Sequence, residues 1–402
     1  MRVARTILLL SVPGLMFFII PIEGISFRLC WQLGAIWLAG IAFMAFLTSW
    51  FRRIFFLLAL LQVVLLENVI LVSYITLMMI AIFLAAIEGF KRICPEHVFN
   101  SICIAGLLLA GWIVLQRAGL LGVFTLGAFG AGPFNIDTAS AFLGMTLPAF
   151  FRGRVFKSPP APLCKGGEMV YWWHLLPLIV AGLFLARAST GVIAALAGAA
   201  VWTFFADGLR KKRVLGAVAV GGLLLVIFFN HVDTAADLAA NPRWRVWQRT
   251  IMTYESAPWG RGLGSYAQIF PLFIATETAL QNTVTVKTIK NDGIGVAVEN
   301  AWLHAHNEYL QTGFEMGLPA MGLLFAFLIF IYGRAWLRRE SLTALDRMAL
   351  SGLAATAVAA AGFHIFHIAP TALLGCAWLG MIDRYQGPEV GDQEKEKLSC
   401  ST

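Results

Sequence analysis

Charge is scarce in this sequence. Only 13% of the 402 residues are Asp, Glu, Lys or Arg, and 59% are hydrophobic, whereas a soluble globular chain is usually about one quarter charged. Apolar runs long enough to cross about 30 Å of hydrocarbon recur along the whole sequence. The composition therefore excludes an ordinary soluble domain and predicts a polytopic integral membrane protein.

Motifs of metal and redox chemistry are also missing. The six cysteines are scattered without a CxxC pair, so no disulfide framework is predicted. His304 and His306 are two residues apart rather than four and no HExxH occurs, so a helical zinc pair is not expected. No Asp-x-Asp pair occurs in segment 231–308, which argues against a metal-dependent nucleotide-sugar enzyme. We expect no metal and no cofactor.

The net charge of +8 does not indicate nucleic acid. The basic residues lie in short clusters between apolar runs, which is the pattern of the positive-inside rule. With an inner N-terminus, most of the 30 Lys and Arg residues fall in inner segments. Those in outer segments are Arg28, Arg117, Arg187, Arg243, Arg245, Arg249, Arg261, Lys287 and Lys290. We therefore predict that both termini are cytoplasmic.

The apolar runs predict an all-α helix bundle of about twelve spans. The predicted spans are 6–22, 28–49, 54–71, 73–90, 98–116, 138–151, 171–186, 189–206, 214–230, 309–333, 345–365 and 368–383. Glu67 and Asn68 interrupt one apolar stretch, and a turn there is favoured because charge at mid-bilayer is costly. The domains are an N-terminal bundle (1–230), a large outer loop (231–308), C-terminal helices (309–385) and a polar tail (386–402) that we expect to be disordered.

The outer loop is predicted to contain a short helix that begins at Pro242, with Asn241 as its N-cap. Trp244, Trp247 and Ile251 are expected to give this helix an apolar outer side that faces the membrane interface, and its arginines are Arg243, Arg245 and Arg249. Arg245 and Arg249 share a face because they are four residues apart. Two interpretations remain open: an interfacial helix whose arginines touch lipid headgroups, or a helix whose arginines bind an anionic substrate.

Three glycines at alternate positions, Gly260, Gly262 and Gly264, follow this helix. They allow close approach of the backbone to a ligand, and exposed amides there would hold anionic oxygens. A flexible turn is the alternative. A dinucleotide fingerprint is rejected because no strand precedes the glycines.

The stretch HAHNEYLQTGFEMGLP (304–319) closes the loop and leads into an apolar run. His306 is a candidate general base for a hydroxyl, and an ordinary interfacial histidine is the alternative. Glu315 is expected to be a buried carboxylate that ties helices together or orients a base. Arg187 at a span end either snorkels to the interface or binds an anion, whereas His364 and His367 are treated as structural.

Cations beside a base are what transfer from a diphosphate leaving group requires. The sequence here resembles the O-antigen ligase/polymerase superfamily of bacterial inner-membrane glycan transferases, from Asn241 to Gly322. Three segments carry the resemblance: Arg243–Trp247, similar to Arg-x-x-x-Trp; Pro258–Gly264, similar to a Pro-x-x-Gly-x-Gly-x-Gly turn; and His306–Gln311 with Glu315–Gly317, similar to His-Asn-x-Tyr-Leu-Gln…Glu-x-Gly.

The resemblance implies a GT-C-like enzyme that moves a glycan from undecaprenyl diphosphate to an acceptor hydroxyl at the periplasmic face, without a metal. It implies His306 as the base and Arg243 as a diphosphate contact, and we add Arg187, Arg245 and Arg261 as diphosphate-binding residues. The supporting residues are His304, Asn307, Tyr309, Glu315, Gly262 and Gly264. The family often has Ser-Arg-Gly where this chain has Ser189-Thr190-Gly191. We hypothesise that Arg187, three residues earlier and close to the same helical face, substitutes for the missing arginine.

Direct displacement at the anomeric carbon would invert its configuration. The motifs do not separate a ligase that uses lipid A core from a polymerase that uses a second lipid-linked repeat, and we favour the ligase slightly. Exopolysaccharide or teichuronic-type polymerisation and glycan transfer to protein also remain open. A transporter or flippase is the alternative of another class, but no half-repeat is visible and the ionisable residues crowd the outer face. A structural scaffold is disfavoured further.

Overall fold

The computed structural model describes residues 80, 83–84, 86–121, 130–131, 134–151, 172–205, 242–266, 269–270 and 304–385. The described chain is mostly helical, with one short antiparallel pair of strands, β1 (Gly130–Ala131) and β2 (Phe134–Asn135). It divides into two compact units, unit 1 (Met1–Thr48, Ala81–His231 and Tyr332–Thr402) and unit 2 (Ser49–Ile80 and Val232–Ile331). The predicted spans 6–22, 28–49, 54–71 and 214–230, most of 73–90, and the tail 386–402 lie outside the described residues.

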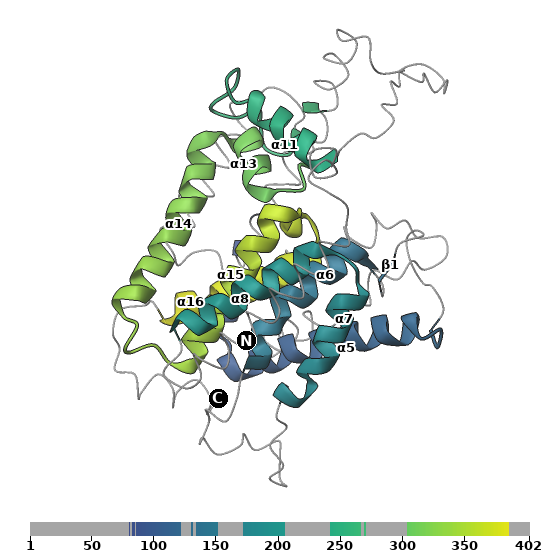
Figure 1. The fold of residues 1–402 in the computed structure, drawn as a ribbon. Coiled ribbons are helices and arrows are strands. Elements are labelled where there is room, and N and C mark those ends of the chain that lie inside the picture. Colours follow the sequence, from purple (N-terminus) through teal and green to yellow (C-terminus); the bar gives the residue numbers. More distant parts are fainter. Residues whose placement is uncertain are drawn as a thin grey trace. The chain divides into compact units, whose positions relative to one another are not determined.

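Unit 1 is a bundle of packed helices (Figure 1). Its helical elements are α5 (Pro95–Arg117), α6 (Ile136–Thr146), η2 (Leu147–Phe151), η3 (Trp172–Leu175), α7 (Leu176–Leu185), α8 (Ser189–Phe205), α15 (Ala344–Gly362), η4 (Ile365–His367) and α16 (Ala369–Tyr385). Helix α8 packs against both α6 and α15, and α5 packs against α7.

Three described helices are long and apolar enough to cross a membrane: α5, α14 (Leu318–Leu337) and α15. Shorter apolar helices cover Ile136–Phe151, Leu176–Leu185 and Ser189–Phe205. Each of these helices overlaps a predicted span, and α14 begins nine residues later than the span predicted at 309–333. The helical class is therefore confirmed for the described residues, and the twelve-span topology stays a prediction.

Small residues bring α6 and α8 together. A side chain at Gly144 or Gly191 would collide with the backbone of the facing helix, which is the kind of close contact that small residues permit between membrane helices. Trp378 of α16 fills the neighbouring core: it is fully buried and donates its indole N–H to the carbonyl of Met145 at 3.1 Å. A fully satisfied tryptophan of this size fixes α16 against α6.

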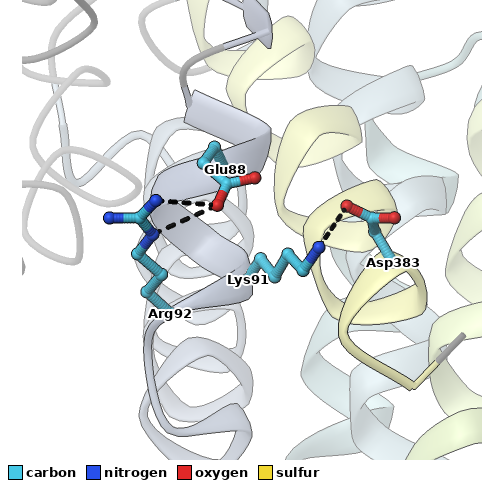
Figure 2. Close-up of polar contacts among 4 residues, drawn as sticks. All are labelled: Glu88, Lys91, Arg92 and Asp383. Atoms are coloured by element: carbon cyan, nitrogen blue, oxygen red, sulfur yellow. Dashed lines mark hydrogen bonds and ion pairs between the residues drawn. The ribbon is translucent and has the colours of Figure 1, made fainter. Parts of the chain in front are cut away.

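Two ion pairs lie at one end of unit 1 (Figure 2). The Nζ atom of Lys91 is 3.1 Å from Oδ2 of Asp383, and a guanidinium nitrogen of Arg92 is 3.0 Å from Oε1 of Glu88. The Lys91–Asp383 pair is partly exposed, so it contributes at most about 1 kcal/mol. It brings the end of the helical segment 86–91 beside the end of α16. The predicted topology places both of these ends on one membrane face, which agrees with this contact but does not require it.

Unit 2 contains α11 (Pro242–Met252), α13 (Glu308–Met316) and most of α14, and Figure 1 shows α11 and α13 side by side. A single helix over 309–333 was expected. The structure corrects this, because α13 ends at Gly317, whose φ of 88° breaks the helix before α14 begins. Glu315 therefore lies on the short α13 and not inside the candidate membrane span.

Candidate active site

A small apolar core holds the three motif segments of unit 2 together. Its buried members are Val246, Tyr254, Tyr266, Phe270, Ala305 and Phe314, with Trp247, Ile269 and Leu310 packed against them. The rings of Tyr266 and Phe270 stack at 4.5 Å, and Phe314 meets Tyr266 edge to face at 4.9 Å. The segments that the sequence marked separately therefore form one folded unit.

Helix α11 begins at Pro242, as predicted, whereas the proposed cap Asn241 lies outside the described residues. Its buried face carries Val246 and Thr250, and its exposed face carries Trp244 and Ile251, which are 49% and 51% exposed. Trp247 was expected on the apolar outer side. The structure corrects this, because Trp247 is partly buried and its indole N–H donates to the carbonyl of Ala305 at 2.8 Å.

Arg243 precedes Trp247 by four residues on α11, so the two side chains leave the helix on the same face. Because Trp247 contacts the segment between the two histidines, this face of α11 is the one that meets the histidine loop. Arg243 is partly buried. The side chain of Arg245 is outside the part of the chain that the structure describes.

The glycine turn docks onto the end of α13. The amides of Arg261 and Gly262 donate to the carbonyls of Phe314 and Glu315 at 2.9 and 3.0 Å, and the amide of Gly264 donates to Oε2 of Glu315 at 2.8 Å. A side chain at Gly260, whose φ is 90°, would lie 2.5 Å from the carbonyl oxygen of Glu315. These three amides are therefore occupied by the protein. The expectation that they hold ligand oxygens is wrong, and the close approach that the glycines permit serves helix docking.

Glu315 is the polar centre of unit 2. The residue is 5% exposed, and its carboxylate accepts hydrogen bonds from the amides of Gly264 and Tyr266 and, at 3.0 Å, from the side-chain amide of Gln311. A buried carboxylate is tolerated only when such donors surround it. The sequence-based expectation of a buried polar tie thus has a specific geometry: one carboxylate joins the glycine turn to α13.

Ala305 is held through both of its backbone polar groups, which belong to two successive peptide groups. Its N–H donates to Oε1 of Gln311 at 3.2 Å, and its C=O accepts from Trp247 at 2.8 Å. The next residue, His306, has a φ of 52°. That left-handed conformation costs a non-glycine residue about 1–2 kcal/mol, and the two hydrogen bonds, each contributing about 1 kcal/mol, offset it. Such strained residues occur preferentially at functional sites.

Neighbouring motif residues support this loop. Asn307 is the N-cap of α13, and its side-chain oxygen accepts from the amide of Leu310 at 3.0 Å. The ring of Tyr309 stacks on Phe325 at 4.8 Å. Burial, and secondarily the Glu308 carboxylate, raise the pKa of Tyr309 to about 12, so its hydroxyl stays protonated at physiological pH. His304 is partly buried beside Ala305.

Arg261 presents its guanidinium beside the glycine turn. One guanidinium nitrogen donates to Oγ of Ser256 at 2.6 Å, and the group lies 5.7 Å from the centre of the Phe314 ring. Burial lowers the pKa of Arg261, but a guanidinium remains charged at physiological pH. The turn therefore carries a positioned positive charge.

Arg187 belongs to unit 1, in the turn between α7 and α8, and its side chain is exposed. Its φ is 58°, so among the described residues the non-glycine residues with positive φ are Arg187 and His306. The expectation that Arg187 shares a helical face with position 190 is wrong, because α8 begins only at Ser189. Thr190 itself is buried, and a side chain at Gly362 would lie 3.3 Å from its Cγ2.

This turn is also fixed by side chains. The carbonyl of Leu185 accepts from Nε of Arg117 at 3.3 Å, and the carbonyl of Ala188 accepts from Oγ of Ser140 at 2.7 Å. Where the residue after a helix C-cap is left-handed it is usually glycine, so Arg187 carries the strain of that conformation.

Within the described residues, no group of three or more His, Cys, Asp or Glu side chains is arranged to hold a metal ion.

A family model described as O-antigen ligase matches residues 174–325. The matched segment runs from η3 through the Arg187 turn, α11, the glycine turn and α13 into α14. No curated protein matches the chain. The family match confirms the resemblance to the O-antigen ligase superfamily and, with the apolar helices, supports a membrane glycosyltransferase of the O-antigen ligase/polymerase type.

Two residues make the contacts that hold the histidine loop. The sequence assigned no role to Gln311, and it assigned Trp247 only to the apolar side of α11. Gln311 carried a signal, because it lies four residues before Glu315 and therefore faces it on a helix. The other partner, the Ala305 peptide, has no side chain that a sequence pattern would mark.

Proposed function

We propose that this protein transfers a glycan from undecaprenyl diphosphate to an acceptor hydroxyl at the periplasmic face of the bacterial inner membrane. The acceptor is lipid A core, so the protein acts as an O-antigen ligase. The ligase is placed before the polymerase because the matched family model carries that description.

The proposal rests mainly on His306. Its left-handed backbone is clamped through the Ala305 peptide, and the clamp is linked by Gln311 and Glu315 to the turn that carries Arg261. A general base must be held in a defined position relative to the hydroxyl that it deprotonates. A purely structural histidine gains nothing from such a strained and specifically bonded loop.

In the proposed reaction, the acceptor oxygen attacks the anomeric carbon while the imidazole of His306 takes the hydroxyl proton. The bond between the anomeric carbon and the phosphate oxygen breaks, and its electron pair leaves with undecaprenyl diphosphate. Because the nucleophile enters opposite the leaving group, the configuration at the anomeric carbon inverts. No metal is required in this scheme.

Cationic side chains would stabilise the departing diphosphate. We assign this role to Arg243, on the face of α11 that meets the histidine loop, and to Arg261 on the glycine turn. Arg187 is included because its turn holds it in an unfavourable conformation, and Arg245 because of its place in the α11 motif. Removing one such donor typically costs about 100- to 1,000-fold in rate. An Arg187→Ala protein that keeps full activity would exclude Arg187 from this set.

The experiment is glycan transfer by the purified full-length protein, reconstituted in lipid, with undecaprenyl diphosphate-linked glycan and either lipid A core or a second lipid-linked repeat. A single product on lipid A core supports the ligase, whereas a ladder of longer lipid-linked glycans would identify a polymerase. Movement of unmodified donor across the bilayer without any new glycosidic bond would instead identify a transporter. The anomeric configuration of the product and activity in EDTA test inversion and metal independence.

A further inference from the structure

Both peptide groups that flank the Cα atom of Ala305 are hydrogen-bonded, and both partners are side chains from other segments. Gln311 of α13 accepts its N–H at 3.2 Å, and Trp247 of α11 donates to its C=O at 2.8 Å. Ala305 is fully buried and lies between His304 and His306. The bond from Gln311 holds the peptide group between residues 304 and 305, and the bond from Trp247 holds the peptide group between residues 305 and 306. Neither plane turns without breaking its bond, and the second plane sets the direction from which the chain enters His306.

The orientation of Gln311 is itself determined. Its Nε2 donates to Oε1 of Glu315 at 3.0 Å, and since a carboxylate only accepts, the amide oxygen of Gln311 must point toward Ala305. Gln311 is 4% exposed, so water does not compete effectively for either bond. The same Glu315 carboxylate binds the amide of Gly264. The histidine loop and the glycine turn are therefore held in register by one buried side-chain pair.

Trp247 positions the histidine loop relative to the third motif segment, helix α11. It lies one helical turn after Arg243 on α11, so its bond to Ala305 sets the distance between that helix and the histidine loop. The histidine loop is thus bonded at Ala305 to Trp247 of α11 and to Gln311 of α13. Through Gln311 and Glu315 it is also linked to the glycine turn.

We propose that Trp247 and Gln311 are positioning residues for His306. By bonding the C=O and the N–H of Ala305, they hold the backbone before His306 and so place the imidazole against the acceptor hydroxyl. They touch neither donor nor acceptor. This inference rests on the proposed function, because it requires His306 to be the base. It predicts that loss of either clamp lowers the rate of the chemical step while donor binding is retained.

The test compares Trp247→Phe and Gln311→Met with Tyr254→Phe in full-length protein, using the lipid-linked donor and lipid A core. Tyr254 is the matched control, because its hydroxyl donates to the carbonyl of Leu310 at 2.8 Å within the same core but does not bond the histidine loop. We expect kcat to fall about 10- to 100-fold in the two clamp variants, with the donor KM within about twofold, because a small misplacement of a catalytic group has that effect. Tyr254→Phe should keep kcat and KM.

A merely structural role predicts a different result: all three variants would lose activity in proportion to their loss of thermal stability, or the donor KM would rise with the fall in kcat. Either outcome, or unchanged kcat in the clamp variants, overturns the inference. A His306→Asn protein is measured alongside. If it retains turnover, the proposed function fails whatever the clamp variants do. If it is inactive and the clamp variants match Tyr254→Phe, only the positioning role fails.

Discussion

The turns at Arg187 and His306 both contain a non-glycine residue in the left-handed conformation, but different hydrogen bonds hold the two turns. Both residues have a left-handed conformation, with φ of 58° and 52°, and both are flanked by peptides that side chains hold. At Arg187 the bonds reach two different carbonyls, of Leu185 and Ala188, and the arginine is exposed. At His306 they reach the N–H and the C=O of one fully buried residue, Ala305, and so hold the two successive peptide groups that lead into the histidine.

The difference follows from what each side chain is proposed to deliver. An arginine carries a permanent charge at the end of a long stem, so its turn needs only to aim the stem toward an anion. An imidazole that takes a proton must meet a single oxygen at hydrogen-bond distance. The tighter clamp therefore lies at the residue whose chemistry has the narrower geometric tolerance.

The largest stability effect is expected for Glu315→Gln. The substitution replaces a buried carboxylate that accepts from three donors, so the free energy of unfolding of unit 2 should fall by about 2–4 kcal/mol. Hydrogen exchange should accelerate in residues 258–266 and 304–316, and transfer activity should fall sharply. The Arg187 turn is the internal control. Equal acceleration around residues 185–191 would show that the two turns are not independent.

Ser140→Ala should weaken the other turn. Ser140 donates to the carbonyl of Ala188 and accepts from the amide of Gly191 at 3.1 Å, so its loss should cost about 1–2 kcal/mol. The measurement is the donor KM, which should rise more than kcat falls because Arg187 would no longer be aimed. Thr146→Val in the same helix is the control, since the Thr146 hydroxyl bonds only within α6. A larger effect of the control variant would remove Ser140 from the account.

At both turns, the glycine variant should be more stable than the alanine variant, which is the reverse of the usual order. His306→Gly should be more stable than His306→Ala by about 0.5–1 kcal/mol, because relief of the left-handed strain exceeds the extra entropy of the unfolded chain. The same order is expected for Arg187→Gly and Arg187→Ala. Thermal unfolding of the four purified proteins tests this, and an alanine variant that melts above its glycine partner would contradict the left-handed geometry at that site.

Arg117→Gln should have the smallest effect. The bond from Arg117 Nε to the carbonyl of Leu185 is 3.3 Å long and exposed, so its removal should change stability by less than about 0.5 kcal/mol. The donor KM should stay within about twofold of the unsubstituted protein. A large rise in KM would mean that this side of the Arg187 turn is held as tightly as the Ala305 peptide.

Features with a repeating or capping signal were predictable from the sequence. The apolar runs predicted the helices that became α5, α8 and α15, and Pro242 predicted the start of α11. Glu315 was predicted to be buried because a carboxylate next to an apolar run requires partners, and it is 5% exposed.

Most features that depend on backbone geometry were not predictable. The end of α13 is an exception, because Gly317 followed by Pro319 is a helix-stop signal that the prediction of one helix over 309–333 did not use. The close approach at Gly317, where a side chain would lie 2.5 Å from the carbonyl carbon of Trp259, had no such signal. The amides of the glycine turn were expected to face a ligand, but α13 occupies them. The left-handed conformation of Arg187 had no signal, because arginine does not favour that region. Histidine is enriched there among non-glycine residues, but most histidines have negative φ, so the residue type alone does not mark position 306.

Turnover of His306→Asn tests the central claim most directly. Asparagine tolerates the left-handed conformation, so the loop should keep its backbone and lose only the imidazole. Transfer from undecaprenyl diphosphate-linked glycan to lipid A core should then fall at least about 100-fold, the usual contribution of a general base, with the donor KM little changed. Turnover within a few-fold of the unsubstituted protein would contradict the assignment of His306 as the base.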